Sequence, residues 1–146
     1  MRVDAAERKA AIDRLSPWFA EMSVALHLGH WEIRVPYETR PDDNMNASIE
    51  RVYGQNVARI FLSDAFLEDS PEEQRETYTH ELLHCHFRQI IEIRDGMSVV
   101  LGLPAFAIFD QQMKNAEEWA VDGISRAIAP LLPLPPSGDT SKAGSR

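Results

Sequence analysis

Two histidines one helical turn apart are the feature that most constrains this chain. Residues 80–84 read His-Glu-Leu-Leu-His, with a glutamate directly after the first histidine. Side chains four residues apart project from the same face of an α-helix, so a helix here would place the His80 and His84 imidazoles side by side. Such a pair can hold a zinc ion, and Glu81 would then stand beside a water bound to that ion.

The flanking residues predict that this segment lies inside a helix. Ser70, Pro71 and Glu73 supply a capping serine, a proline at the first helical position and a capping-box glutamate. The next strong breaker is Asp95-Gly96, so we expect a helix over 71–94. The residues next to the motif are uncharged, which favours a partly buried site over a solvated helix face.

Composition limits the classes of partner. The chain has 146 residues, a net charge of −8 and one cysteine. The negative charge disfavours nucleic acid as a partner, and the single cysteine excludes an internal disulfide and a cysteine-rich zinc ribbon. No signal peptide and no apolar run long enough for a membrane span are present, so we expect a cytoplasmic protein with no membrane contact. Nothing in the pattern specifies an oligomeric state.

The first half of the chain predicts one helical region and a small sheet. Two helical patterns, 5–15 and 17–28, are joined at Pro17, which we interpret as a kink or a fresh start. Residues 31–35 alternate apolar and polar side chains, as a half-buried strand does. Two β-rich runs, 47–53 and 57–62, flank a turn and predict a hairpin.

The second half predicts one more helix and a tail. Residues 97–109 are apolar but irregular, and we expect a buried loop with a short helix there. A helix is expected over 110–129, followed by a disordered tail rich in Pro, Ser and Gly over 131–146. Residues 1–130 would then form a single α+β domain, with an N-terminal helix, a three-stranded sheet, the motif helix and a C-terminal ligand-bearing helix.

A catalytic zinc takes three protein ligands, so a third ligand is needed. Glu118 is the candidate, because Asp122 lies one helical turn beyond it and could accept the free ring N–H of a liganding histidine. Glu117 is the rival ligand, but its own i+4 neighbour is Val121, which cannot play that supporting part. The open alternative is that Glu118 and Asp122 belong to a polar stripe that is merely solvated.

At this point the chain resembles the gluzincin group of zinc metallopeptidases, which pair HExxH with a glutamate ligand on a downstream helix, often as ExxxD. The matching segments are HELLH at 80–84 and EWAVD at 118–122, with Thr77 at a favoured position. His86 departs from the pattern, since an apolar residue is usual there. The strand order resembles a minimal zincin core, and the compact size resembles small bacterial or phage-encoded gluzincin-like proteins.

The resemblance implies peptide hydrolysis, and the residues support the same chemistry. Zinc would activate a water, and Glu81 would act as the general base on that water. A peptide or protein substrate could lie against an exposed strand of the 47–62 hairpin. An oxyanion donor is also needed, and Tyr53, Tyr78 and Arg126 stay open for that role.

Two further interpretations compete with a peptidase. The protein could be a zincin-like binding or regulatory module that recognises a partner without catalysis. It could also be a helical interaction protein in which HExxH occurs by chance and the apolar segment 97–109 is the contact surface.

Overall fold

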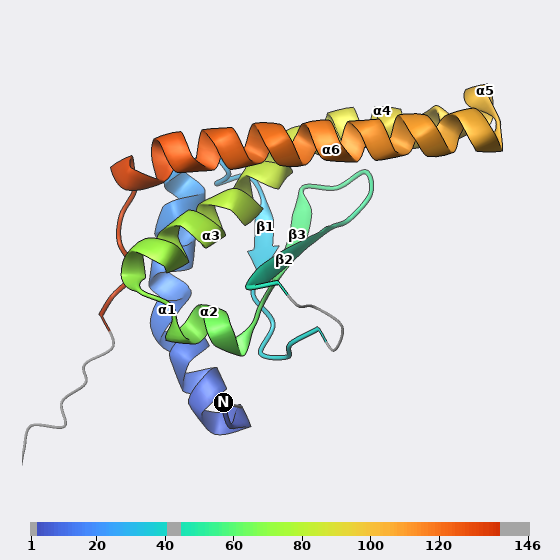
Figure 1. Cartoon of the computed structure of the whole chain (residues 1–146). Helices are drawn as coiled ribbons and strands as arrows, with labels where there is room; N and C mark the ends of the chain where they lie inside the picture. Colours follow the sequence, from blue (N-terminus) through green and yellow to red (C-terminus); the bar gives the residue numbers. More distant parts are fainter. Residues whose placement is uncertain (1–2, 41–44, 138–146) are drawn as a thin grey trace, which may run out of the picture.

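The computed structural model describes residues 3–40 and 45–137. The chain runs through a long helix, three strands and then a series of helices, so the fold is α+β, as predicted (Figure 1). No helix among the described residues is both long and apolar enough to cross a membrane.

Helix α1 (Ala5–Ala25) is continuous. The Asp4 carboxylate accepts hydrogen bonds from the backbone N–H groups of Ala6 and Glu7, which caps the first turn. Of the kink or fresh start expected at Pro17, the fresh start is wrong, because the helix runs through this residue. Proline removes one backbone hydrogen bond and its ring crowds the carbonyl of residue i−4, and packing of the helix on the core offsets these costs.

The three strands form one mixed sheet in the order β1-β3-β2. Strand β1 (Glu32–Arg34) pairs in parallel with β3 (Val57–Leu62), and β2 (Ala47–Arg51) pairs antiparallel with β3. The predicted hairpin and the predicted first strand are therefore confirmed. Gly54, in the hairpin turn, has a φ of 71°, a conformation that glycine adopts without steric cost. Strand β2 lies at one edge of the sheet, so its outer side is unpaired within it.

The core lies between α1, the sheet and the motif helix. Trp18 and Phe19 from α1 pack against Tyr78 with tilted rings, whose centroids are 5.2 and 4.6 Å from that of the tyrosine ring. Aromatic pairs at these distances stabilise a core beyond the area that they bury. Fully or nearly fully buried aliphatic residues complete this core: Leu15, Met22, Leu28, Ile60, Leu62 and Leu82.

The motif helix begins as predicted. After the short helix α2 (Asp64–Glu68), helix α3 covers Pro71–Leu83. Ser70 and Glu73 form a complete capping box, in which each side chain bonds to the backbone N–H of the other residue. This cap sets where α3 starts, and hence which of its residues face the sheet.

The motif helix ends earlier than expected. A 3₁₀ turn, η1 (His84–Phe87), interrupts the predicted 71–94 helix before α4 (Arg88–Gly96) continues. At this interruption Arg51 donates a hydrogen bond of 2.6 Å to the carbonyl oxygen of His84. The partner is on β2, so the break reflects a tertiary contact that local patterns do not contain.

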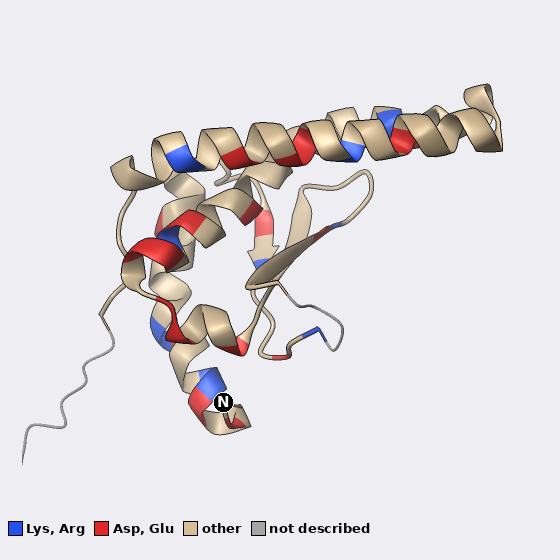
Figure 2. Ribbon diagram, in the orientation of Figure 1, with Lys and Arg blue, Asp and Glu red and all other residues tan. Residues whose placement is uncertain are grey.

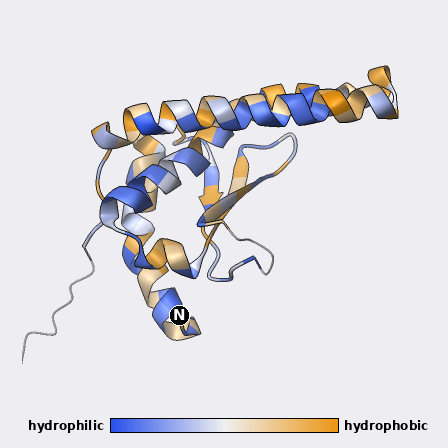
Figure 3. Ribbon diagram, in the orientation of Figure 1, coloured by the Kyte–Doolittle hydropathy of each residue, from blue (hydrophilic) through white to orange (hydrophobic). Residues whose placement is uncertain are grey.

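The expectation of a buried loop over 97–109 is wrong. Helix α5 (Ser98–Leu101) is followed at once by α6 (Leu103–Ile128), with Gly102 at a φ of 71° between them. The apolar residues of this segment lie at the far end of a helical hairpin, where Val99 is 90% exposed (Figures 1 and 3). The C-terminal helix therefore starts seven residues before the expected position, 110.

The chain beyond α6 stays in contact with the domain. After the 3₁₀ turn η2 (Ala129–Leu131), Trp18 donates its indole N–H to the carbonyl oxygen of Pro133 at 2.9 Å. Arg75 donates to the carbonyl oxygen of Leu132 at 3.1 Å. Of the tail expected to be disordered, residues 131–137 are thus described and the first of them pack on the helices, whereas 138–146 lie outside the described residues.

Candidate metal centre

The two motif histidines face each other at the end of α3. Their Nε2 atoms are 3.3 Å apart, and their rings meet edge to face. His84 opens the 3₁₀ turn but keeps helical backbone angles, so the one-turn relationship to His80 is preserved. The His84 side chain is 7% exposed and that of His80 18% exposed, so the pair lies just beneath the surface.

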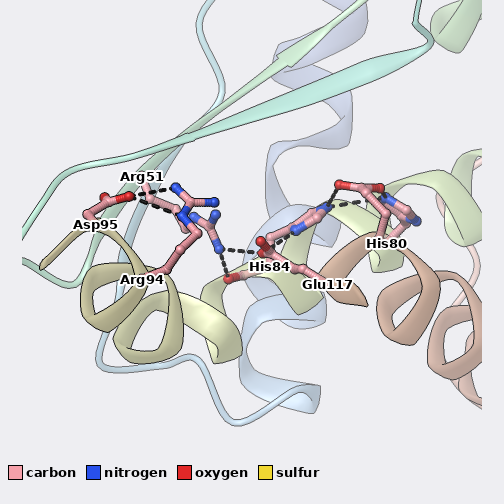
Figure 4. Close-up of polar contacts among 7 residues, drawn as sticks. Arg51, His80, His84, Arg94, Asp95 and Glu117 are labelled. Carbon is pink, nitrogen blue, oxygen red and sulfur yellow. Dashed lines mark hydrogen bonds and ion pairs between the residues drawn. The ribbon is translucent and has the colours of Figure 1, made fainter. Parts of the chain in front are cut away.

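Glu118 reaches this pair from α6. Its two carboxylate oxygens lie 3.4 Å from Nε2 of His80 and 3.3 Å from Nε2 of His84. The three residues form the one group among the described residues whose ligand atoms converge in a way that could hold a metal ion. Figure 4 shows the His80 and His84 imidazoles facing each other. The structure thus brings together the three residues that the sequence predicts as ligands.

Asp122 supports His80 from behind. Its Oδ1 lies 3.1 Å from Nδ1 of His80, on the ring nitrogen that faces away from Glu118. A carboxylate at this nitrogen keeps the proton on Nδ1 and leaves the Nε2 lone pair free for a metal. The structure therefore places Asp122 where the sequence analysis expects it.

Glu117 has a role that the sequence analysis missed. Its Oε1 accepts from Nδ1 of His84 at 2.7 Å and from Nη1 of Arg51, also at 2.7 Å (Figure 4). Burial raises the pKa of this carboxyl group, but the hydrogen bonds from His84 and Arg51 outweigh burial and hold the pKa below its ordinary value. Glu117, the rival ligand, therefore contacts Nδ1 of His84 in the same way that Asp122 contacts Nδ1 of His80.

The spacing of the two imidazoles suits a tetrahedral metal ion. Ligand atoms about 2.0–2.2 Å from a tetrahedral centre lie roughly 3.3–3.6 Å from one another. The two Nε2 atoms are 3.3 Å apart, and each of them lies within 3.4 Å of a different oxygen of Glu118. One ligand atom from each of the three residues lies within 4.8 Å of the other two. A carboxylate beside each Nδ1 atom favours the tautomer with the proton on Nδ1. The two Nε2 atoms and the Glu118 carboxylate are then all acceptors, and a cation between them would relieve their mutual repulsion.

Glu81 lies beside the ligands without joining them. It is 4% exposed and borders two cavities on either side of His80, of about 370 and 480 Å³. The cavities are walled by α3 and α6 on one side and by the first residues of β2 on the other. Acidic side chains of α3 and α6 give the lining of the 370 Å³ cavity a net negative charge (Figure 2), whereas acidic and basic side chains balance in the 480 Å³ cavity. A groove beside an unpaired sheet edge can accept an extended chain.

The three candidate oxyanion donors have different surroundings. Arg126 borders the same cavity as His80 and Glu81. Tyr53 is 70% exposed in the hairpin turn and borders a separate cavity formed with α4. Tyr78 is fully buried in the aromatic core, and its hydroxyl has no hydrogen-bond partner. Of the three, Arg126 is the one whose position suits the role.

The remaining histidines lie elsewhere. His86 points back to α1, where its Nε2 lies 2.9 Å from the carbonyl oxygen of Leu26. His27 and His30 are exposed after the end of α1, and His27 has a φ of 57°. These contacts explain why His86 can depart from the apolar residue usual at its position without disturbing the candidate centre.

Comparison with known protein families, with curated proteins and with solved structures found no match to this chain.

Proposed function

We propose that this protein is a zinc-dependent peptidase with a zincin-like fold. The observation that carries the proposal is the convergence of His80, His84 and Glu118 in a group that could hold a metal ion, with a carboxylate at the Nδ1 atom of each histidine. Three protein ligands with space for water define a catalytic rather than a structural zinc site. The substrate class would be peptides or proteins.

Each residue then has a defined task. Zinc in such a site supplies Lewis acidity, which acidifies a water molecule and polarises a carbonyl group. Glu81 accepts the proton of the attacking water and passes it to the leaving amine. Asp122 and Glu117 fix the tautomers of His80 and His84, and Arg51 neutralises Glu117.

The surroundings support an extended substrate. Strand β2 forms the edge of the sheet nearest to α3, and Ala47 and Ser48 border the two cavities. An edge strand offers unpaired backbone groups to which a peptide can hydrogen-bond. A small sheet that precedes the motif helix, with its edge strand beside the site, supports the zincin-like assignment. A cytoplasmic location, suggested by the lone buried Cys85, belongs to the same proposal.

The decisive experiment compares the wild-type protein with Glu81→Gln. Elemental analysis should find one zinc per chain in both proteins, and a broad peptide library should be cleaved by the wild-type protein alone. A wild-type protein that holds no stoichiometric divalent metal would contradict the proposal, and so would full activity in Glu81→Gln.

One observation favours the alternative of a binding module that does not catalyse. Tyr53 and Tyr78 lie outside the two cavities, which leaves Arg126 as the one remaining donor of the three considered. Arg126 is itself 3.9 Å from Glu76 and largely exposed. Peptides that bind the zinc-loaded wild-type protein without being cleaved would establish this alternative.

A further inference from the structure

Arg51 is connected to His84 by two routes. It is the last residue of β2, and its Nη1 atom donates to the carbonyl oxygen of His84 at 2.6 Å and to Oε1 of Glu117 at 2.7 Å. The same Oε1 accepts from Nδ1 of the His84 ring at 2.7 Å. These contacts form a closed circuit, which leaves His84 at its carbonyl oxygen, passes through Arg51 and Glu117, and returns to His84 at its ring (Figure 4). We call it the His84 circuit.

The His84 circuit is buried and joins three elements of the fold. The side chains of His84 and Glu117 are each 7% exposed, and that of Arg51 is 19% exposed. Arg51 comes from β2, His84 from the end of the motif helix, and Glu117 from α6. Hydrogen bonds to charged groups are stronger than neutral ones, and more so where water is excluded. The circuit therefore restrains the direction of the His84 ring and its position relative to the sheet.

The 3₁₀ turn after α3 favours the contact with the His84 carbonyl. In an α-helix, the N–H of Arg88 would donate to the carbonyl oxygen of the residue four positions earlier, which is His84. Here that N–H donates to the carbonyl oxygen of Cys85 instead. The carbonyl oxygen of His84 can therefore accept from Arg51, and the helix changes its form at the residue that would bind the metal.

The support of His80 is of a different kind. Asp122 lies 3.1 Å from Nδ1 of His80, but the Asp122 side chain is 48% exposed. A contact that solvent reaches restrains its partners less than a buried one. Of the two histidines, His84 is the one whose orientation the surrounding fold determines more strictly.

We propose that Arg51 is a positioning residue, which raises the affinity of the centre for zinc by fixing the orientation of His84 through the His84 circuit. The inference rests on the proposed zinc site but not on peptide hydrolysis. A ligand that is already oriented loses less conformational freedom when the metal binds, so the affinity is higher. Arg51 acts in this way without being one of the three residues that could hold the ion.

The first test measures zinc affinity by competition with a chromophoric chelator, while circular dichroism verifies that each variant is folded. Arg51→Met should weaken zinc binding by about tenfold or more. Arg88→Met is the matched control and should bind zinc as the wild-type protein does, because Arg88 is 17% exposed and pairs with Glu92 at 3.0 Å. Arg51→Lys keeps the positive charge beside Glu117 and should have an intermediate affinity, so it replaces Arg51→Met if that variant does not fold.

A double-mutant cycle tests whether the contacts act together. Glu117→Ala alone should also weaken zinc binding. The combination of Arg51→Met with Glu117→Ala should weaken it by much less than the product of the two single effects, because a circuit that is already open loses little more restraint when it is opened again.

The third measurement is made without metal. The Nδ1 proton of His84 should exchange with solvent faster in Arg51→Met than in the wild-type protein, as NMR would show, whereas that of His80 should be unchanged. An unchanged zinc affinity in Arg51→Met, an equal loss in Arg88→Met, effects that multiply in the cycle, or an unchanged exchange rate at His84 would overturn this inference alone. A wild-type chain that binds no zinc would overturn it together with the proposed function.

Discussion

Glu117 and Glu118 are neighbours in sequence but point to opposite sides of the same histidine. Glu117 contacts Nδ1 of His84 at 2.7 Å, and Glu118 contacts Nε2 of the same ring at 3.3 Å. Their side chains are 7% and 55% exposed, respectively. One carboxylate is therefore part of the buried framework, and the other faces the space in which a metal would bind.

This difference predicts opposite effects of two adjacent substitutions. Glu117→Ala leaves Arg51 without its buried partner, so the metal-free protein should lose about 2–4 kcal/mol of unfolding free energy. Glu118→Ala should change the stability of the metal-free protein by less than about 0.5 kcal/mol, because its side chain is mostly exposed, but should abolish stoichiometric zinc binding. Denaturant unfolding with and without chelator, together with zinc analysis, measures both. Equal stability losses in the two variants would contradict these assignments.

Asp122→Ala tests the support behind His80. The fold should remain intact, since Asp122 is partly exposed, but zinc affinity should fall by roughly 10–100-fold, because the tautomer of His80 is no longer fixed. A competition titration with a chromophoric chelator gives the affinity. Asp110→Ala, on the same helix but away from the centre, is the control. An affinity equal to that of the wild-type protein would remove Asp122 from the site.

Ser70→Ala should destabilise the protein by about 1 kcal/mol at neutral pH, because it removes the cap of α3. The Ser70 hydroxyl is also the main cause that lowers the pKa of Glu73, so this pKa should return toward its ordinary value, as NMR titration would show. A lowered carboxyl pKa stabilises the fold above the unfolded-state pKa and ceases to do so as the pH falls through the folded-state pKa.

The difference between Ser70→Ala and the wild-type protein should therefore shrink in acid. Ser63→Ala is the matched control, since Ser63 caps α2 through Phe66 without a partner glutamate. The effect of Ser63→Ala on unfolding free energy should be the same at neutral pH and in acid. If the loss of unfolding free energy in Ser70→Ala does not change with pH, Glu73 does not contribute to the stability of the cap.

Truncation after Leu132 should lower stability by about 1–3 kcal/mol, because the indole N–H of the buried Trp18 then loses its acceptor, the carbonyl oxygen of Pro133. A truncation after Ser137 keeps that acceptor and serves as the control. Thermal unfolding of the two truncated chains distinguishes them. Identical melting temperatures would mean that the Trp18 contact contributes nothing measurable.

Periodicity and capping were enough to predict the elements that bear the candidate site. The start of α3, the hairpin and the pairing of His80 with His84 all follow from spacing within a few residues. The 3₁₀ turn after Leu83 and the role of Glu117 could not be predicted in this way, because both depend on Arg51. That residue lies 66 positions before Glu117 in the chain, and no local pattern indicates the contact. The expectation of a buried loop over 97–109 is wrong because apolar composition alone does not distinguish a buried loop from the exposed end of a helical hairpin.

The continuity of α6 has a mechanical consequence. Glu117, Glu118 and Asp122 all lie on one uninterrupted helix, so a rotation or translation of α6 displaces all three carboxylates together. A metal ion held between His84 and Glu118 would also act as a cross-link between points thirty-four residues apart (118 − 84), closing a loop that contains the whole hairpin end. Packing of α6 against α3 and binding of the ion would then be cooperative. The ion would stabilise the packed position of α6, and α6 would supply a ligand to the ion.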